Sequence, residues 1–418
     1  MILPIAIPER RDPKSIERGA THPLPKDSRT DPQSQLNTER ARVTVRTAIA
    51  HRRTRVLITV PHLHSAGSPY REMIGLVRFL PRELFDVTVA TLRESQSEEA
   101  RGILEGLGAH VVQVRFRPTG PGPAALVRTL SGWRSIRDLA PFDIQHSLDF
   151  SSSPIEAIDA RLGRRKFVFN LRNMNENGHP WLLRSKIRLA HLVIAISKDT
   201  ARLARAHGAR REQVVTIHNG IEPELLAEGL EAGKQKQRTI LCVGALIPGK
   251  RHSDAIRAFA QLLKTHPDLR LQLAGQPSYD VAHAHHLRIT CESLGIASRV
   301  DFLGISRDVV PLMKSASVFL TCSQSEGVPW SVVEAMALRI PVVASDIPGH
   351  RELIVDGREG TLVPLGDIDG FATALGRLLD CRAVAESLVE NGWRRIEAEF
   401  RADQMAAQTA EVYRSLTS

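Results

Sequence analysis

The chain has 418 residues, of which 42% are hydrophobic and 24% are charged, and its formal net charge is +10 at pH 7. These values are ordinary for a globular protein, and the length suffices for two domains that each bury a core. No apolar run approaches the roughly 18 residues needed to cross a bilayer, which argues against an integral membrane protein. The opening M-I-L-P-I-A-I-P has two prolines and no preceding basic region, so we expect no signal peptide.

Basic residues gather in two stretches. Residues 1–55 carry twelve Lys or Arg against six Asp or Glu, and residues 1–50 show no sustained period, which predicts a disordered basic tail. The second stretch has eight basic residues against Glu176 alone: Arg161, Arg164, Arg165, Lys166, Arg172, Arg184, Lys186 and Arg188.

Few aromatic residues interleave with this second stretch and no nucleic-acid-binding signature is present, so we expect no nucleic acid partner. An anionic membrane surface or a phosphate-linked acceptor suits the charge better, and a plain solvated basic face remains the alternative. We therefore expect a cytoplasmic protein, either free or peripheral on the inner face of the membrane.

From residue 55 onward, short apolar runs alternate with helical segments. A first series of runs lies at residues 55–60, 87–92, 111–114, 144–147, 166–171, 192–197 and 214–217, and a second lies at 239–244, 269–275, 300–304, 318–322, 341–345 and 360–364. Continuous Val, Ile and Leu strands separated by helices predict parallel sheets covered on both faces. The pattern thus predicts two Rossmann-like domains, residues 51–225 and 238–399.

Two segments connect or close these domains. The sequence between Leu225 and Arg238, which includes A-G-K-Q-K-Q-R, predicts an exposed linker. The segment from Trp393 to Leu416 has apolar residues at helical spacing, which predicts one amphipathic helix at the end of the chain.

The most informative stretch is V-F-L-T-C-S-Q-S-E-G-V-P-W-S-V-V-E-A-M-A-L, from Val318 to Leu338. It predicts a buried strand, a polar turn and a helix that begins near Pro329. Anions bind where the carboxyl end of a parallel strand meets a helix N-terminus. We expect Glu326, in the turn, to accept hydrogen bonds from hydroxyls beside a bound phosphate, and Glu334, in the helix, to reach the vicinal hydroxyls of a ribose. Two solvated helix-end charges are the alternative.

The spacing E-x7-E with G-V-P after the first glutamate, followed by P-G-H-R-E at residues 348–352, resembles the signature of the retaining glycosyltransferases of family 4. The resemblance extends over almost the whole chain from about Arg55. It implies the GT-B fold, in which two Rossmann-like α/β domains face a cleft and a C-terminal helix, here residues 400–418, crosses back to complete the first domain. It also implies a nucleotide-sugar donor on the second domain, with its pyrophosphate at the backbone amides of Gly327 and Val328.

The segment G-A-L-I-P-G-K-R, Gly244 to Arg251, admits two interpretations. It matches the G-x4-G-K of a phosphate-binding loop, but Arg251 stands where Ser or Thr would hold magnesium, which disfavours an ATPase. The family pattern here is a glycine, usually an arginine, and then a lysine, so Gly244 and Lys250 match while Ala245 departs. The resemblance implies that Lys250 neutralises the departing diphosphate, with help from Arg251 or Arg351. A solvated loop lysine is the alternative.

Three other positions complete the predicted site. His146 ends a predicted strand and matches the family's D-x-x-H pattern, which implies contact with the donor sugar; a satisfied surface histidine is the alternative. Gly67, in S-A-G-S, falls where the family has a glycine loop near phosphate and acceptor. Gly304 follows a strand of the second domain and resembles a family position near the nucleotide, where a glycine lets backbone approach a ligand.

The four cysteines, Cys242, Cys291, Cys322 and Cys381, are widely spaced and form no C-x-x-C motif. We expect small buried hydrophobic residues in a reducing compartment, without disulfides or metal ligands. The sequence therefore predicts no metal or other cofactor.

Together these features predict a retaining glycosyltransferase that moves a hexose-type sugar from a nucleoside diphosphate donor to a saccharide or lipid-linked acceptor, in cell-surface or exopolysaccharide synthesis. No residue is an obvious nucleophile on the reacting face, which is consistent with front-side displacement. Two alternatives remain open: a nucleotide-sugar epimerase of the same fold, and a catalytically weak scaffold that binds nucleotide-sugars.

Overall fold

The computed structural model describes residues 52–63, 68–92, 97–114, 141–149, 151–172, 180–231, 238–277, 280–306 and 308–418. The predicted tail of residues 1–50 and Gly67 lie outside these ranges. The chain divides into two units, Met1–Arg53 and Thr54–Ser418, and both sheets belong to the second unit.

Every predicted apolar run forms a strand. The first series forms a seven-stranded parallel sheet in the order β3-β2-β1-β4-β5-β6-β7, and the second forms a six-stranded parallel sheet in the order β10-β9-β8-β11-β12-β13. The strands of the first sheet are β1 (Thr54–Val60), β2 (Phe85–Thr91), β3 (His110–Gln113), β4 (Ile144–Ser147), β5 (Lys166–Leu171), β6 (Leu192–Ala195) and β7 (Val214–Thr216). Those of the second are β8 (Thr239–Val243), β9 (Arg270–Ala274), β10 (Val300–Gly304), β11 (Val318–Thr321), β12 (Val342–Ser345) and β13 (Thr361–Val363).

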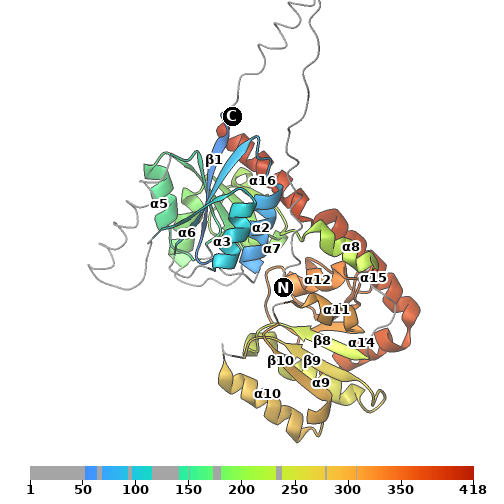
Figure 1. Cartoon of the computed structure of the whole chain (residues 1–418). Coiled ribbons are helices and arrows are strands. Elements are labelled where there is room, and N and C mark those ends of the chain that lie inside the picture. The colour runs from blue at the N-terminus through green and yellow to red at the C-terminus, as the bar shows by residue number, and fades with distance from the viewer. Residues whose placement is uncertain are drawn as a thin grey trace, which may run out of the picture. The chain divides into compact units, whose positions relative to one another are not determined.

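Helices cover both faces of the first sheet (Figure 1). One face packs on α2 (Ser68–Phe79), α3 (Glu98–Gly106) and α16 (Ala402–Thr417), through side chains such as Ile58, Met73 and Tyr413. The other packs on α5 (Ile155–Leu162), α6 (Pro180–Leu189) and α7 (Lys198–Ala206). Because both faces are buried, the strands are largely apolar, and polar residues within them such as Gln145, His146 and Asn170 are buried as well.

The second sheet is covered in the same way. One face packs on α9 (His252–Leu262), α10 (Val281–Ser293) and α14 (Ile368–Asp380). The other packs on α8 (Pro223–Glu231), α11 (Val310–Ser315), α12 (Trp330–Ala337) and α15 (Arg382–Glu399), and the short α13 (Pro348–Arg351) follows β12. The two sheets thus form two α/β layers of the predicted kind.

The segment predicted as an exposed linker is in part a packed helix. Leu226 of α8 is buried against the second sheet, and a Cβ on Gly229 would lie 2.0 Å from the carbonyl oxygen of Ala337, so this glycine lets α8 approach α12 closely. The linker prediction was therefore wrong for residues 225–231. Residues 232–237 lie outside the described ranges.

The predicted closing helix is two helices, because the chain breaks between α15 and α16. The amide of Ile221 donates to the carbonyl of Phe400 (2.8 Å), and the amide of Ala402 donates to the carbonyl of Ile221 (2.7 Å). A Cβ on Gly220 would lie 2.2 Å from the carbonyl carbon of Arg401. The chain thus crosses twice at one place, and backbone pairing there interrupts a segment whose periodicity favours one helix. The helix after the break, α16, packs on α2 and the first sheet, as predicted.

Both sheets have the strand order of the Rossmann type, which reverses direction between β1 and β4 and between β8 and β11. Ligands of such sheets bind beyond the carboxyl ends of the strands at that reversal. The segments after β4, β8 and β11 are therefore where a ligand is expected, and His146, Lys250 and Glu326 lie in or beside them.

Candidate active site

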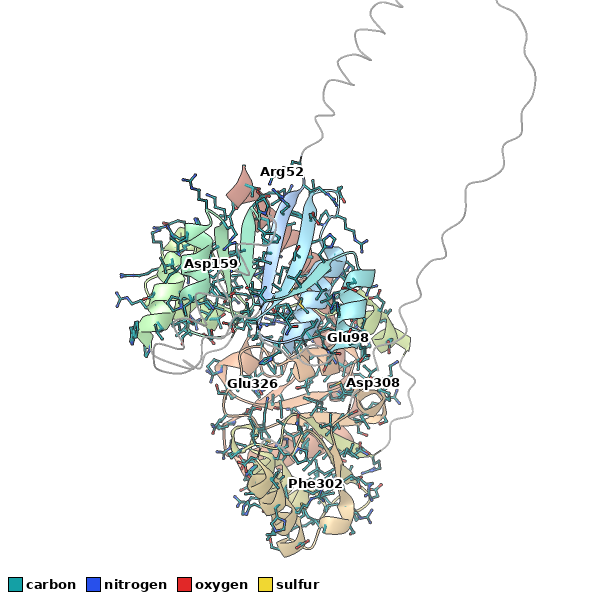
Figure 2. All side chains as sticks on the ribbon, turned by 60° about the vertical axis from the view of Figure 1, so that its left-hand side comes forward. Arg52, Glu98, Asp159, Phe302, Asp308 and Glu326 are labelled. Atoms are coloured by element: carbon teal, nitrogen blue, oxygen red, sulfur yellow. The ribbon has the colours of Figure 1, made fainter. Side chains whose placement is uncertain are left out.

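The centre of the site is an ion pair between Lys250 and Glu326. Lys250 ends a short 3₁₀ turn after β8, and Glu326, labelled in Figure 2, lies in the loop after β11. The Lys250 Nζ contacts Glu326 Oε1, and the amide of Gln324 donates to the carbonyl of Gly249 (3.0 Å). The lysine and glutamate side chains are 29% and 14% exposed, so solvent still reaches the pair. The structure thus brings together the two residues predicted to meet the diphosphate and the donor sugar.

The Glu326 loop rests on the segment after β12. A Cβ on Gly349 would lie 2.5 Å from the carbonyl oxygen of Glu326 and 2.7 Å from that of Gly327, so only glycine fits. Beneath it, His350 is fully buried, and its Nδ1 lies 2.7 Å from the carbonyl oxygen of Ser345. Burial lowers the pKa of His350, and the nearby carbonyl and the Glu326 carboxylate oppose this less strongly. The imidazole is therefore neutral and ties the segment that carries Gly349 to the end of β12.

The loop after β8 packs on the end of β9. A Cβ on Gly275 would lie 1.7 Å from the carbonyl oxygen of Gly244, so the two glycines let these backbones meet. The methylene groups of Lys250 lie beside Gly244. Gly304 has a φ of +67°, with no atom within 4 Å of where its Cβ would be, so the end of β10 is open there.

The two arginines predicted to assist Lys250 are paired elsewhere. Arg251 has a left-handed φ of 51°, and its Nε donates to Asp254 Oδ2 (2.6 Å). Arg351 is exposed and makes a bidentate pair with Asp346 at 2.5 and 2.7 Å. Of the predicted cations, the structure therefore places Lys250 alone on Glu326.

Glu334 is buried in α12 and forms an ion pair with Arg71 of α2. Burial lowers the pKa of Arg71, while Glu222 and Asp308 raise it. A buried carboxylate without a cation would be costly, so Arg71 stabilises Glu334 in the absence of a ligand. The sequence offered no signal for this pair, because its members come from different sheets.

His146 is buried at 1% exposure instead of lying open at a strand end. Its Nδ1 lies 2.6 Å from the Tyr413 hydroxyl of α16, and its Nε2 has no partner among the described residues. Burial, followed by the charge of Arg172, lowers the pKa of His146 to about 3. The imidazole is therefore neutral, with one nitrogen left for a ligand.

Sequence reasoning passed over a polar cluster next to His146. Glu72 of α2 is buried and accepts hydrogen bonds from Asn170 Nδ2 on one oxygen and from Arg172 Nη2 on the other. Burial raises the pKa of Glu72, and Arg172 counters this. Polar residues at alternate positions in and directly after an otherwise apolar strand, at 170 and 172, were the signal that could have revealed the cluster.

Only some of the eight basic residues of the stretch 161–188 lie at the surface. Arg165 is buried against Asp159 of α5 (labelled in Figure 2), Arg172 is buried on Glu72, and Lys186 is fully buried. A surface interpretation was therefore wrong for these three residues. The exposed remainder comprises Arg161, Arg164, Lys166, Arg184 and Arg188. Trp181, at the start of α6, is 63% exposed.

Lys186 forms a network at the carboxyl end of β4. Its Nζ donates to the carbonyl oxygens of Asp149 (3.1 Å) and Ser151 (3.0 Å), and it lies 3.5 Å from Glu156 Oε2 and 4.4 Å from the centre of the Phe169 ring. Glu156 also accepts hydrogen bonds from the hydroxyls of Thr59 and Ser147. This buried charge ties the backbone of Asp149 and Ser151, beside the site, to α6.

Three of the cysteines, Cys242, Cys291 and Cys322, are buried as predicted, whereas Cys381 is exposed; none of the four forms a disulfide. Within the described ranges, no group of three or more His, Cys, Asp or Glu side chains is arranged to hold a metal ion. No helix in the same ranges is long and apolar enough to span a bilayer.

Two family profiles match the two halves of the chain. The one described as Glycosyl transferases group 1 matches residues 231–395, and the one described as Glycosyltransferase Family 4 matches residues 71–225. The chain belongs to this glycosyltransferase family. The fold is accordingly GT-B, as the sequence predicted.

Individual relatives agree with this assignment. The chain is 31% identical over 243 residues to the exopolysaccharide phosphotransferase of Streptomyces coelicolor, and this match covers 58% of this chain and 25% of that protein. It is 30% identical over 196 residues to the lipopolysaccharide core biosynthesis mannosyltransferase LpcC of Rhizobium leguminosarum, covering 46% and 56%. The matches thus span a quarter of the length of the first relative and just over half that of the second.

A solved structure extends the likeness to most of the chain. HepE of Anabaena, in complex with UDP and glucose, superposes with a TM-score of 0.69 at 20% identity, covering 86% of this chain and 99% of that one. At this level of identity the likeness shows the fold alone.

Proposed function

We propose that this family member is a retaining glycosyltransferase that transfers a sugar from a nucleoside diphosphate donor to a saccharide or lipid-linked acceptor in polysaccharide synthesis. The observation that carries the proposal is the pairing of Lys250 with Glu326 in front of the N-terminus of α12. A cation and a helix N-terminus suit a diphosphate, and a carboxylate beside them suits sugar hydroxyls. HepE, a protein of the same fold, binds UDP and glucose.

The donor-site roles follow from position. Lys250 and the backbone amides of Gly327 and Val328 would hold the pyrophosphate, Glu326 the sugar hydroxyls near C3, and Glu334 the ribose. Gly244, Gly304 and Arg251 would line the donor, with the glycines allowing close approach of backbone. His146 would offer its unpartnered Nε2 to the donor sugar.

Binding exchanges partners within the site. Without ligand, Lys250 pairs with Glu326 and Arg71 pairs with Glu334. A diphosphate would take Lys250, which frees Glu326 for the sugar, and a ribose would compete with Arg71 for Glu334. Lys250 would thus exchange a carboxylate for a phosphate, and Glu326 and Glu334 would exchange a cation for hydroxyl donors, which limits the cost of opening the pairs.

The proposed reaction depends on electrostatic stabilisation of the leaving group and involves no protein nucleophile. Lys250 and the amides of Gly327 and Val328 would stabilise the developing charge on the leaving diphosphate, the role that a metal has in other transferases. The leaving phosphate would assist deprotonation of the acceptor on the same face, so configuration is retained. We propose that no metal cofactor is required.

The acceptor side is proposed to face an anionic membrane. Of the five exposed basic residues of the stretch 161–188, Arg161 lies in α5 and Arg184 and Arg188 lie in α6, which also carries the exposed Trp181. Exposed arginines with an interfacial tryptophan suit an anionic lipid surface that carries a lipid-linked acceptor. Sedimentation with vesicles containing anionic lipid, compared with neutral vesicles, tests this part.

The decisive experiment is thermal denaturation across a panel of UDP-, GDP- and ADP-sugars, because a ligand that binds the native state raises its stability by mass action. One donor is expected to raise the melting temperature, and Lys250→Met is expected to reduce that effect. Lys264→Met, which removes an exposed lysine of the same half, is the control. Transfer must then require both donor and acceptor. Turnover of donor alone to an epimer, or binding without any turnover, would contradict the proposal.

A further inference from the structure

The polar cluster of Glu72, Asn170 and Arg172 is held rigidly but is not fully satisfied. Both carboxylate oxygens of Glu72 accept hydrogen bonds, one from each partner. The Arg172 and Glu72 side chains are only 7% and 3% exposed. Asn170 holds the Glu72 carboxylate through one oxygen, and the other oxygen accepts from Arg172 Nη2, so a buried charge-assisted hydrogen bond ties the guanidinium to a fixed carboxylate.

Three buried atoms in and beside this cluster have no hydrogen-bond partner among the described residues. They are Arg172 Nη1, Asn170 Oδ1 and His146 Nε2. His146 and Val168 are partners in the β4–β5 register, so His146 and Asn170 lie on the same face of neighbouring strands. Buried polar atoms are almost always paired, and a ligand with both negative charge and hydroxyl groups would pair these three.

Arg172 also lies against the proposed diphosphate site. A Cβ on Gly327 would be 2.6 Å from the carbonyl oxygen of Arg172, so the residue directly after β5 packs on the loop that leads into α12. The same loop carries Glu326, the partner of Lys250. The backbone directly after β5 thus reaches the loop that carries Glu326.

The donor site as described has one suitable cation for a ligand with at least two negative charges. Lys250 provides that charge, whereas Arg251 and Arg351 are held by Asp254 and Asp346. A second cation in a partly enclosed site would add much to the binding of a diphosphate leaving group.

We propose that Arg172 supplies this second cation, donating from Nη1 to the diphosphate of the donor while Glu72, itself held by Asn170, keeps the guanidinium in place. The inference rests on the proposed function, since it names a contact of the same donor. In this arrangement the first sheet contributes a charge to a ligand bound mainly on the second, so diphosphate binding draws on both sheets.

The test compares a nucleoside diphosphate with its monophosphate by isothermal titration calorimetry. The diphosphate is whichever of UDP, GDP and ADP binds the wild type best. Arg172→Met is expected to weaken diphosphate binding about tenfold or more and monophosphate binding by less than about threefold, because a charge-assisted contact to the second phosphate is lost. Arg202→Met, which removes an arginine with a 72% exposed side chain, should leave both affinities unchanged.

Variants of Glu72 separate ligand binding from folding. Glu72→Gln keeps Arg172 and is expected to hold diphosphate affinity within about threefold, whereas the double variant Glu72→Gln/Arg172→Met removes both charges and should lose affinity while remaining folded. Equal losses in Glu72→Gln and Arg172→Met, equal losses for both nucleotides, or unchanged affinity in Arg172→Met would overturn the inference. A wild type that binds none of the three diphosphates would instead overturn the proposed function, and the inference with it.

Discussion

Replacing Lys186 by Met tests how much the buried ion pair with Glu156 and Asp149 contributes to stability. The substitution keeps a long unbranched side chain but removes the ammonium group that lies 3.5 Å from Glu156 Oε2 and 3.7 Å from Asp149 Oδ2. Because Lys186 is fully buried and Glu156 is 2% exposed, water cannot compensate for its loss.

The expected cost is large because the partner charge stays behind. Removing one member of a buried ion pair costs about 3–5 kcal/mol, and we expect a loss of stability in this range near neutral pH. Burial raises the pKa of Glu156 above its ordinary value, and Lys186 holds it down. Without the lysine this pKa rises further. The folded state then binds a proton that the unfolded state releases, so the stability of the variant falls as pH rises from the unfolded to the folded pKa of Glu156.

Urea denaturation followed by circular dichroism at about pH 5 and about pH 7.5 measures the effect. The gap between Lys186→Met and the wild type should be wider at the higher pH. The double variant Glu156→Gln/Lys186→Met should recover most of the stability at the higher pH, because it has no unpaired carboxylate at position 156. Lys264→Met, which removes an exposed charge, is the control. A loss below about 1 kcal/mol, or one that is the same at both pH values, would refute the reasoning.

Four further outcomes are expected. Gly220→Ala should lower the free energy of unfolding, measured by urea denaturation, by about 1–3 kcal/mol, because its Cβ would lie 2.2 Å from a backbone atom. Gly102→Ala, whose Cβ would have no atom within 4 Å, should raise it by about 0.5–1 kcal/mol. Similar values for the two variants would contradict the close chain crossing at Gly220. Lys250→Met should lower kcat/KM for transfer about 10²–10³-fold without unfolding, and a loss under threefold would argue against its role at the leaving group. Arg71→Met should tighten the binding of a nucleoside diphosphate in calorimetry, because the ribose then has no cation to displace from Glu334. Weaker binding would show that Arg71 and the ligand do not compete for Glu334. Transfer should be unchanged by EDTA, and restoration by added magnesium would refute a metal-free reaction.

Much of the fold could be predicted because parallel strands leave a strong local pattern. Runs such as L-V-I-A-I, residues 192–196, are apolar at every position, since both faces of a strand in a covered sheet are buried. The pairing of Lys250 with Glu326 was also accessible, because each follows a strand and the carboxyl ends of parallel strands share one edge. The functional roles assigned to these residues remain predictions.

The sequence by itself determined the spacing of apolar residues in strands and helices, the two-sheet architecture, and the positions of Glu326 after a strand and Glu334 in the next helix, because these depend on neighbours within a few residues. The tertiary structure decided the rest. It buried Lys186 within a predicted basic surface, joined His146 to Tyr413 across 267 residues, paired Arg71 with Glu334, and broke the last helix at Phe400. Each of these depends on a partner far away in the chain, and the energy of a buried polar group is set by that partner instead of by local pattern.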